Sequence, residues 1–253
     1  EISECLVGSE MCIRDSVKEN EIDVIVNCAA YTAVDKAEDN QELCAKLNSE
    51  AVGYLAKAAE ENQAEFIQIS TDYVFDGTNY VPYRETEPTC PNSVYGVTKL
   101  AGEKKALEYC SKAMIIRTAW LYSVFGNNFV KTMIRLGKER ESLGVIFDQI
   151  GTPTYARDLA SAVFAAIRKG IIPGIYHFSN EGVCSWYDFT KSIHRIAGIG
   201  NCKVSPLHTD EYPAKAPRPH YSVLDKTKIK HTYGIEIPHW EESLEQCIKE
   251  LNV

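Results

Sequence analysis

The sequence lacks a long hydrophobic run and an excess of basic residues. No apolar stretch approaches the roughly 18 residues that a membrane span requires, so no membrane association is expected. The net charge is −8, and no basic stripe offsets it, which excludes a general nucleic-acid binder. No basic segment leads into a long apolar stretch near the first residue, so we expect no secretory signal and a cytoplasmic location.

The sequence also lacks paired cysteines. It contains nine cysteines, but no two of them form a CxxC pair, which argues against a zinc site. Several lie within or next to apolar segments, among them Cys28, Cys44 and Cys247. We therefore expect free, buried thiols in a cytosolic protein, and we assign no metal site.

Strand and helix patterns alternate along the chain. Short apolar runs predict strands at Asp23–Asn27, Phe66–Ile69, Met114–Arg117, Val145–Phe147 and Ile175–Phe178. Helical spacing of apolar residues predicts helices at 41–62, Tyr95–Tyr109, Asn128–Arg140 and Ala156–Lys169. This alternation predicts an α/β fold with a doubly wound parallel sheet.

The texture changes after about residue 171, where prolines punctuate shorter elements. Helices are predicted at Trp186–Ala197 and Trp240–Leu251. We interpret residues 17–170 as a partial dinucleotide-binding domain and 171–253 as a smaller substrate-binding lobe, interleaved with the first and closing over one end of the sheet. The segments 79–94 and 203–223 are expected to be long loops, which in compact domains are usually functional.

Residues 1–16 show neither a helical nor a strand period. Their stretch CLVGSEMCIRDS resembles translated sequencing-adaptor sequence, and a divergent native terminus is the alternative. Because the regular pattern starts at Val17, we expect residues 1–16 to be a non-native or disordered extension outside the folded core. Their deletion would then leave the melting temperature almost unchanged.

A YxxxK spacing, Tyr95 to Lys99, falls on a predicted helix. This spacing places the phenol and the ammonium on one face, one turn apart. A free tyrosine titrates near pKa ~10, and a nearby ammonium would draw that pKa toward neutrality. Such a pair can protonate a carbonyl oxygen. The motif is short, and the alternative is a surface tyrosine beside a solvated lysine.

The segment from Ser70 to Gly77 directly follows a predicted strand. The carboxyl ends of parallel strands face the ligand crevice, so the hydroxyl of Thr71 or Ser70 can fix a carbonyl group beside Tyr95. A turn stabilised by these hydroxyls is the alternative.

Ordered sequence blocks resemble the dTDP-4-dehydrorhamnose reductase family, which are extended short-chain dehydrogenase/reductase-like enzymes of deoxysugar biosynthesis. They are NCAAYTAVDKAE at 27–38, STDYVFDG at 70–77, VYGVTKLAGE at 94–103, RTAW at 117–120, GNNF at 126–129, DQIGTPT at 148–154 and APRP at 216–219. The resemblance covers about 17–253, and seven blocks in order are far more specific than any one motif.

The resemblance implies a Rossmann-like fold and a reductase that uses NADPH or NADH. Its substrate would be dTDP-4-dehydro-L-rhamnose, whose C4 keto oxygen receives a proton from Tyr95. Lys99 would lower the pKa of Tyr95 and hold the nicotinamide ribose, and Thr71 would orient the carbonyl.

Other positions match cofactor and substrate contacts of that family. The cofactor contacts would be Ala29, Ala30, Tyr31 and Thr32, together with Tyr95 and Lys99. Asp72 and Trp120 would contact the substrate, although Trp120 could also belong to the core. Arg218 could meet the nucleotide diphosphate or lie on the surface. His177 is expected to be a core histidine.

One feature of such folds is not found in this sequence. They open with a strand, a glycine-rich turn and a helix whose N-terminus meets the pyrophosphate, yet Gly8 is the only glycine before Gly53 and no GxxGxxG occurs. We therefore expect that the amino-terminal part of the enzyme, with its first strands, is missing. The choice between NADPH and NADH stays open.

Two other functions share parts of this pattern. The beta subunit of methionine adenosyltransferase has the same fold without catalysis, and nucleotide-sugar epimerases and dehydratases share YxxxK. The intact Thr71, Tyr95 and Lys99 favour a reductase over the regulatory subunit. The STDYVFDG, DQIGTPT and APRP blocks point away from the epimerases and dehydratases. A homodimer is a further expectation from the resemblance.

The expected gap predicts unequal ligand binding. Calorimetry on the purified chain should show weak or no NADPH binding, because the backbone amides that receive the pyrophosphate are missing, and some dTDP binding. Micromolar NADPH affinity together with measurable reductase turnover would show this prediction to be wrong.

Overall fold

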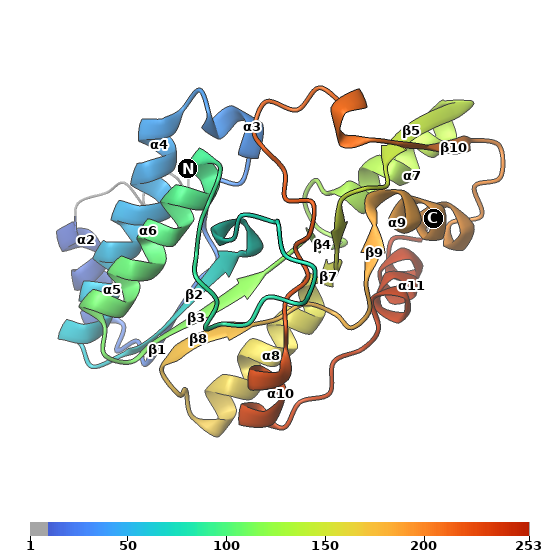
Figure 1. Cartoon of the computed structure of the whole chain (residues 1–253). Coiled ribbons are helices and arrows are strands. Elements are labelled where there is room, and N and C mark those ends of the chain that lie inside the picture. The colour runs from blue at the N-terminus through green and yellow to red at the C-terminus, as the bar shows by residue number, and fades with distance from the viewer. Residues whose placement is uncertain (1–9, 253) are drawn as a thin grey trace.

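The computed structural model describes residues 10–252 and is built on one parallel sheet. Its strands are β1 (Val24–Asn27), β2 (Glu65–Thr71), β3 (Ala113–Thr118) and β8 (Gly174–His177). They pair in the order β1-β2-β3-β8 (Figure 1). All residues of β3 are buried, as expected of a strand covered on both faces. The predicted α/β class is confirmed, and four of the five predicted strands form this sheet.

Helices cover both faces of this sheet. One face packs against α5 (Ala51–Glu61) and α6 (Val94–Tyr109), and the other against α8 (Ala156–Lys169) and α10 (Thr227–Tyr233). Alternate residues of β3 supply the two cores: Ile115 faces α5 and α6, whereas Met114 and Ile116 face α8 and α10. The sheet is therefore doubly wound, as predicted. The predicted helix 41–62 consists of α4 (Gln41–Ala45), a π-helical turn η1 (Lys46–Glu50) and α5.

A second, smaller core lies beside the sheet (Figure 1). Its helices are α7 (Phe129–Glu139), α9 (Trp186–Ile196) and α11 (Trp240–Glu250). Its short strands are β4 (Leu121–Tyr122), β5 (Ser142–Ile146), β6 (Ile150–Gly151), β7 (Thr154–Tyr155), β9 (Cys184–Ser185) and β10 (Lys203–Leu207). The remaining short elements are α3 (Val34–Ala37), η2 (Asp72–Val74) and η3 (Thr209–Glu211).

The chain passes between the two cores more than once. The strand predicted at Val145–Phe147 appears as β5, but it pairs with β10 rather than with the main sheet. Residues 203–207, expected to be loop, form β10. Conversely, β8 and α10 follow residue 171 yet belong to the sheet core. No single boundary along the sequence therefore separates the cores.

The first described helix corrects the expectation for residues 10–16. Helix α2 (Glu10–Glu19) begins before Val17 and packs against α5. Val17 is buried, and Arg14 lies 3.9 Å from Glu61 of α5. The expectation that residues 10–16 lie outside the folded core is therefore wrong, because they belong to a helix that packs against α5. Residues 1–9 of the expected extension lie outside the described part.

Five of the cysteines are buried, whereas Cys12, Cys28 and Cys90 are exposed. The expectation of buried thiols therefore holds for Cys44, Cys110, Cys184, Cys202 and Cys247 but not for the three exposed cysteines. Within residues 10–252, no helix combines the length and the hydrophobicity needed to cross a membrane.

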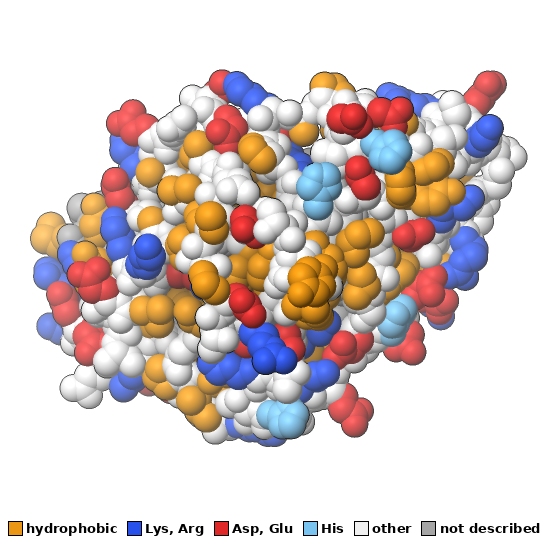
Figure 2. All heavy atoms as spheres, viewed as in Figure 1, with side chains coloured by type: hydrophobic (Ala, Val, Ile, Leu, Met, Phe, Trp, Pro, Cys, Tyr) orange, Lys and Arg blue, Asp and Glu red, His pale blue; other side chains and the backbone are white. Residues whose placement is uncertain are grey.

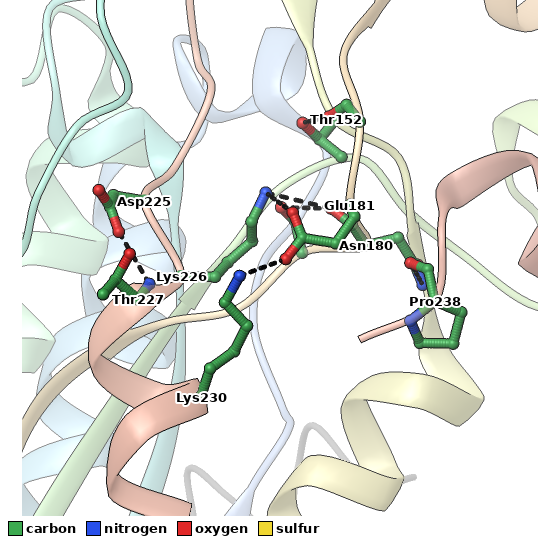
Figure 3. A network of polar contacts seen from close by, with 10 residues as sticks. Thr152, Asn180, Glu181, Asp225, Lys226, Thr227, Lys230 and Pro238 are labelled. Atoms are coloured by element: carbon green, nitrogen blue, oxygen red, sulfur yellow. Dashed lines mark hydrogen bonds and ion pairs between the residues drawn. The ribbon is translucent and has the colours of Figure 1, made fainter. Parts of the chain in front are cut away.

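A polar network joins α10 to the turn after β8 (Figure 3). Lys226 is buried, and its ammonium lies 3.3 Å from Glu181 and donates to the Asn180 carbonyl. Lys230 approaches the same carboxylate at 2.7 Å. Burial lowers the pKa of Lys226, and Glu181 opposes that shift. Asn180 in turn donates to the Pro238 carbonyl ahead of α11, so the network ties the sheet core to the smaller core.

A buried ion pair lies beneath the carboxyl edge of the sheet. Arg117 of β3 donates to both carboxylate oxygens of Glu103 of α6, with Nη2 to Oε2 at 2.7 Å and Nε to Oε1 at 3.0 Å. Ser70 of β2 donates a third hydrogen bond to Glu103. Both charged side chains are 2% exposed. This pair links one helix to two strands.

We expect Arg117→Met to destabilise the protein strongly. It leaves the Glu103 carboxylate buried without its cation, which typically costs about 3–5 kcal/mol. The double variant Arg117→Met, Glu103→Leu should regain much of that loss, because neither charge is then buried. Urea denaturation measures both. Arg135→Met, which removes a surface pair with Glu139, is the control and should cost under about 1 kcal/mol. Similar small losses for Arg117→Met and Arg135→Met would contradict the assignment.

Candidate active site

Thr71 and Asp72 stand where β2 ends. The Thr71 hydroxyl caps the short helix η2 by accepting from the Tyr73 amide. It also donates to Asp72 Oδ1 at 2.9 Å. Both side chains are buried. The turn predicted as an alternative is therefore present, and it is what points the Thr71 hydroxyl into the site.

Helix α6 brings Tyr95 against this turn. Its N-cap Ser93 accepts from the Gly96 amide at 3.1 Å. A Cβ on Gly96 would come within 2.3 Å of the Tyr73 carbonyl oxygen, so only glycine allows this approach. The Tyr95 phenol then hydrogen-bonds Thr71, and its ring meets that of Tyr73 edge-on with centroids 5.4 Å apart.

Lys99 lies one turn further along α6 and is buried. Its ammonium donates to the Ile69 carbonyl of β2 at 2.7 Å. Burial lowers the pKa of Lys99 to about 8, against the opposing charge of Glu103. The nearby Cys28 thiol, at the start of the loop after β1, interacts electrostatically with this ammonium.

The expected lowering of the Tyr95 pKa is not what the structure shows. Burial raises the pKa of Tyr95, and the Thr71 hydroxyl is the main opposing influence. Lys99 donates to the Ile69 carbonyl and is not among the main influences on the pKa of Tyr95. Tyr95 therefore holds its proton firmly at neutral pH, as a proton donor must.

The loop 29–32 is held by a residue that the sequence analysis did not single out. Asn48, in the π-helical turn η1, accepts from the Tyr31 amide at 2.8 Å and donates to the Tyr31 carbonyl at 3.2 Å. It also donates to Thr98 of α6 at 3.2 Å. Asn48 is fully buried, and a polar residue within a predicted helix was the signal that could have found it. Ala29, Ala30 and Tyr31 stay partly exposed, and Thr32 is exposed.

Trp120 lies on the other side of the site and is not plain core. Its backbone has φ of 49°, an unusual left-handed conformation that costs of order 1–3 kcal/mol and often marks functional sites. Its indole stacks on Trp186 with centroids 3.5 Å apart. Both line a cavity of about 260 Å³. The other lining residues are Tyr73, Phe129, Met133, Gly144, Val145, Ile146, Gln149, Tyr212, Ala214, Arg218 and Pro219.

Arg218 connects this cavity to the loop beyond 29–32. It pairs with Asp35 of α3 at 2.8 Å, and the Ala216 amide donates to the same carboxylate at 3.0 Å. The Arg218 guanidinium also acts to lower the pKa of Tyr73, although burial raises that pKa overall, and its Nη1 is buried without a partner. Residues 212–224 therefore form a strap across the face between the two cores, where Figure 2 shows hydrophobic side chains gathered around the middle of the view.

His177 lies in the core, as expected. It is fully buried, and its Nδ1 lies 3.1 Å from the Tyr83 carbonyl oxygen. Burial lowers its pKa to about 3. Within residues 10–252, no group of three or more His, Cys, Asp or Glu side chains is placed to hold a metal ion.

The structure thus brings Thr71, Asp72, Tyr95 and Lys99 to the edge where β2 ends. The loop 29–32 borders this cluster through Cys28 and Asn48. Trp120 lies with Tyr73 and Arg218 on the cavity side. A phenol, a hydroxyl and a buried ammonium next to an aromatic cavity suit the protonation of a carbonyl group.

Comparisons with known proteins agree with this arrangement. The family model described as RmlD substrate binding domain matches residues 4–253, so the likeness begins earlier than the expected boundary at Val17. The dTDP-4-dehydrorhamnose reductase of Escherichia coli K12 is 44% identical over an alignment of 248 residues that covers 94% of this chain and 83% of that protein.

Solved structures lead to the same family. A dTDP-4-dehydrorhamnose reductase from Clostridium acetobutylicum has a TM-score of 0.93 at 44% identity, covering 97% of this chain and 86% of that one. The Bacillus anthracis enzyme, solved in complex with NADP, has a TM-score of 0.92 at 41% identity, covering 96% of this chain and 85% of that one. The chain belongs to the dTDP-4-dehydrorhamnose reductase family.

Proposed function

We propose that this protein is a reductase that transfers a hydride from NADPH or NADH to the C4 keto group of dTDP-4-dehydro-L-rhamnose, giving dTDP-L-rhamnose. The observation that carries the proposal is the Tyr95 phenol on the Thr71 hydroxyl, with the buried Lys99 one turn behind it. Relatives that share more than two fifths of their residues with the chain carry the reductase name.

The residues around Lys99 fit a dinucleotide. The small side chains of Ala29 and Ala30 leave the loop backbone open, and Asn48 holds that loop through both backbone groups of Tyr31. The Lys99 ammonium, at the floor of the site, would hold ribose hydroxyls. When bound, the reduced nicotinamide supplies the hydride. The Bacillus anthracis relative was solved with NADP, which supports a cofactor of this class.

The cavity beside Trp120 fits the nucleotide sugar. Its lining is mostly aromatic and apolar, with Gln149 and Arg218 as polar groups. The unpartnered Nη1 of Arg218 is suited to an anionic diphosphate, and Trp120 offers a flat face to the sugar ring. Asp72, next to Thr71, would contact the sugar hydroxyls.

Tyr95 supplies the proton that completes the reduction. Its raised pKa keeps the phenol protonated at neutral pH. Thr71 lies beside that phenol, and its hydroxyl would orient the carbonyl oxygen when it donates to that oxygen in place of Asp72. The regulatory-subunit alternative finds no support, since the relatives named above are reductases. A cytoplasmic location and a homodimer stay predictions.

We expect Tyr95→Phe to lower turnover by about 10²–10⁴, the usual scale of general acid catalysis, while the fold and the cofactor affinity persist. Lys99→Met should lose turnover and weaken cofactor binding as well, because the ammonium serves both. Steady-state kinetics and calorimetry compare them, in the chain joined to the upstream strand and glycine turn expected above. Near-normal turnover in Tyr95→Phe would refute the assignment.

Asn48→Ala should weaken binding of the dinucleotide cofactor, measured with NADP. Removal of the amide leaves the Tyr31 amide and carbonyl without their partner, so the loop 29–32 loses its fixed position; unpaired groups of this kind cost about 1–3 kcal/mol. Calorimetry in the same protein measures the affinity. Asn40→Ala removes a surface amide bonded to the Lys36 carbonyl and serves as the control. Equal affinities in the two variants would remove Asn48 from the site.

A further inference from the structure

Asp72 is a buried carboxyl group without a cation. Only 3% of the residue is exposed, and its Oδ1 accepts from Thr71 at 2.9 Å. The Ser222 hydroxyl, on the strap, is near enough to lower its pKa. Its Oδ2 is buried and has no partner. Burial and hydrogen bonds, rather than a neighbouring cation, are the main influences on its pKa.

Thr71 connects this carboxyl group to the proton donor. Its hydroxyl gives its hydrogen to Asp72 Oδ1 and shares a second hydrogen bond with the Tyr95 phenol. A single hydroxyl hydrogen serves one partner at a time, so Thr71 can donate either to Asp72 or to the phenol oxygen. The hydrogen bond of Thr71 lowers the pKa of Tyr95, as a bond donated to the phenol oxygen does. Tyr95, Thr71 and Asp72 therefore form an unbroken chain of oxygen atoms along which protons can move.

We propose that Asp72 is the proton-relay residue that restores Tyr95 after each turnover, through the Thr71 hydroxyl. This inference rests on the proposed function. When Tyr95 gives its proton to the keto oxygen it becomes a phenolate. Thr71 then passes its proton to the phenolate oxygen and takes one from protonated Asp72. Asp72 is left as a carboxylate, which regains a proton from water when the site opens, and the three groups are restored.

The ionisation of the chain permits this direction of transfer. Burial raises the pKa of Asp72 to about 6 and raises that of Tyr95 far above it. A phenolate therefore takes a proton readily from the Asp72 carboxyl group. The titratable or charged groups facing Asp72 are Tyr95 of α6 and Tyr73 of η2, with Arg218 of the strap behind Tyr73.

The relay predicts a pH dependence with a definite sign. Asp72 must carry a proton to act. Its protonated fraction is close to one well below pH 6 and falls as the pH rises, by nearly tenfold for each unit above the pKa of about 6. The first turnover uses the proton already on Tyr95 and should stay flat from pH 6 to 8. Single-turnover and steady-state rates, measured in the protein used for Tyr95→Phe, should therefore separate as pH rises.

Variants test the relay against a simple contact. Asp72→Asn keeps the shape but has no titratable proton, so the decline of the steady-state rate with rising pH should vanish. At pH 6 the steady-state rate should fall at least about tenfold more than the single-turnover rate. Ser222→Ala removes a hydroxyl that lowers the Asp72 pKa, so the decline of the steady-state rate should begin at a higher pH. An Asp72→Asn variant with the wild-type pH profile and only a raised KM would overturn the relay.

Infrared spectroscopy of the chain itself gives a readout that needs no turnover. A protonated carboxyl band titrating near pH 6 should appear, and Asp72→Asn should abolish it. Glu85→Gln is the matched control, because burial also raises the pKa of Glu85 and that residue lies outside the relay. The band should survive in Glu85→Gln. If the wild-type protein does not reduce the keto sugar, the proposed function fails; absence of this band overturns the relay whether or not the protein is active.

Discussion

The buried pairing of Arg117 with Glu103 determines where the reacting groups stand. Glu103 belongs to α6, Arg117 to β3, and Ser70, which also bonds Glu103, to β2. A charge held out of water is strongly destabilising once its partner is removed, so the helix cannot slide along the sheet without a large loss. Lys99 lies one turn before Glu103 on α6, and Tyr95 one turn before Lys99. Fixing Glu103 therefore fixes the two residues that would carry the chemistry.

Close backbone approach completes this placement. A Cβ on Gly102 would come within 2.1 Å of the Asn48 carbonyl oxygen, just as Gly96 permits contact with η2. Helix α6 thus lies against both the turn that carries Thr71 and the π-helical turn that carries Asn48. The proposed cofactor loop and the proposed proton donor are held by the same helix.

Burial adjusts the ionisation of the site in a consistent way. It disfavours the charged form of every group, so the pKa of Tyr95 and of Asp72 rises whereas that of Lys99 falls to about 8. At neutral pH the phenol is protonated, the lysine is still mostly charged, and Asp72 can exchange a proton. Burial, acting on three residue types, thus prepares a proton donor, a cation and the proposed proton source.

The sequence by itself determined the elements and the chemistry of the site. Short apolar runs predicted the four strands of the sheet, and helical spacing predicted α6 and α8, because burial on both faces and amphipathic helices leave clear patterns. The ordered motifs placed Thr71, Tyr95 and Lys99 together. Tertiary structure alone decided the role of Asn48, the pairing of β5 with β10 and the direction of the Tyr95 pKa. These depend on partners far apart in the chain and on desolvation, neither of which a local pattern encodes. Helix α2 was missed for the same reason, since its stability comes from contact with α5 rather than from its own sequence.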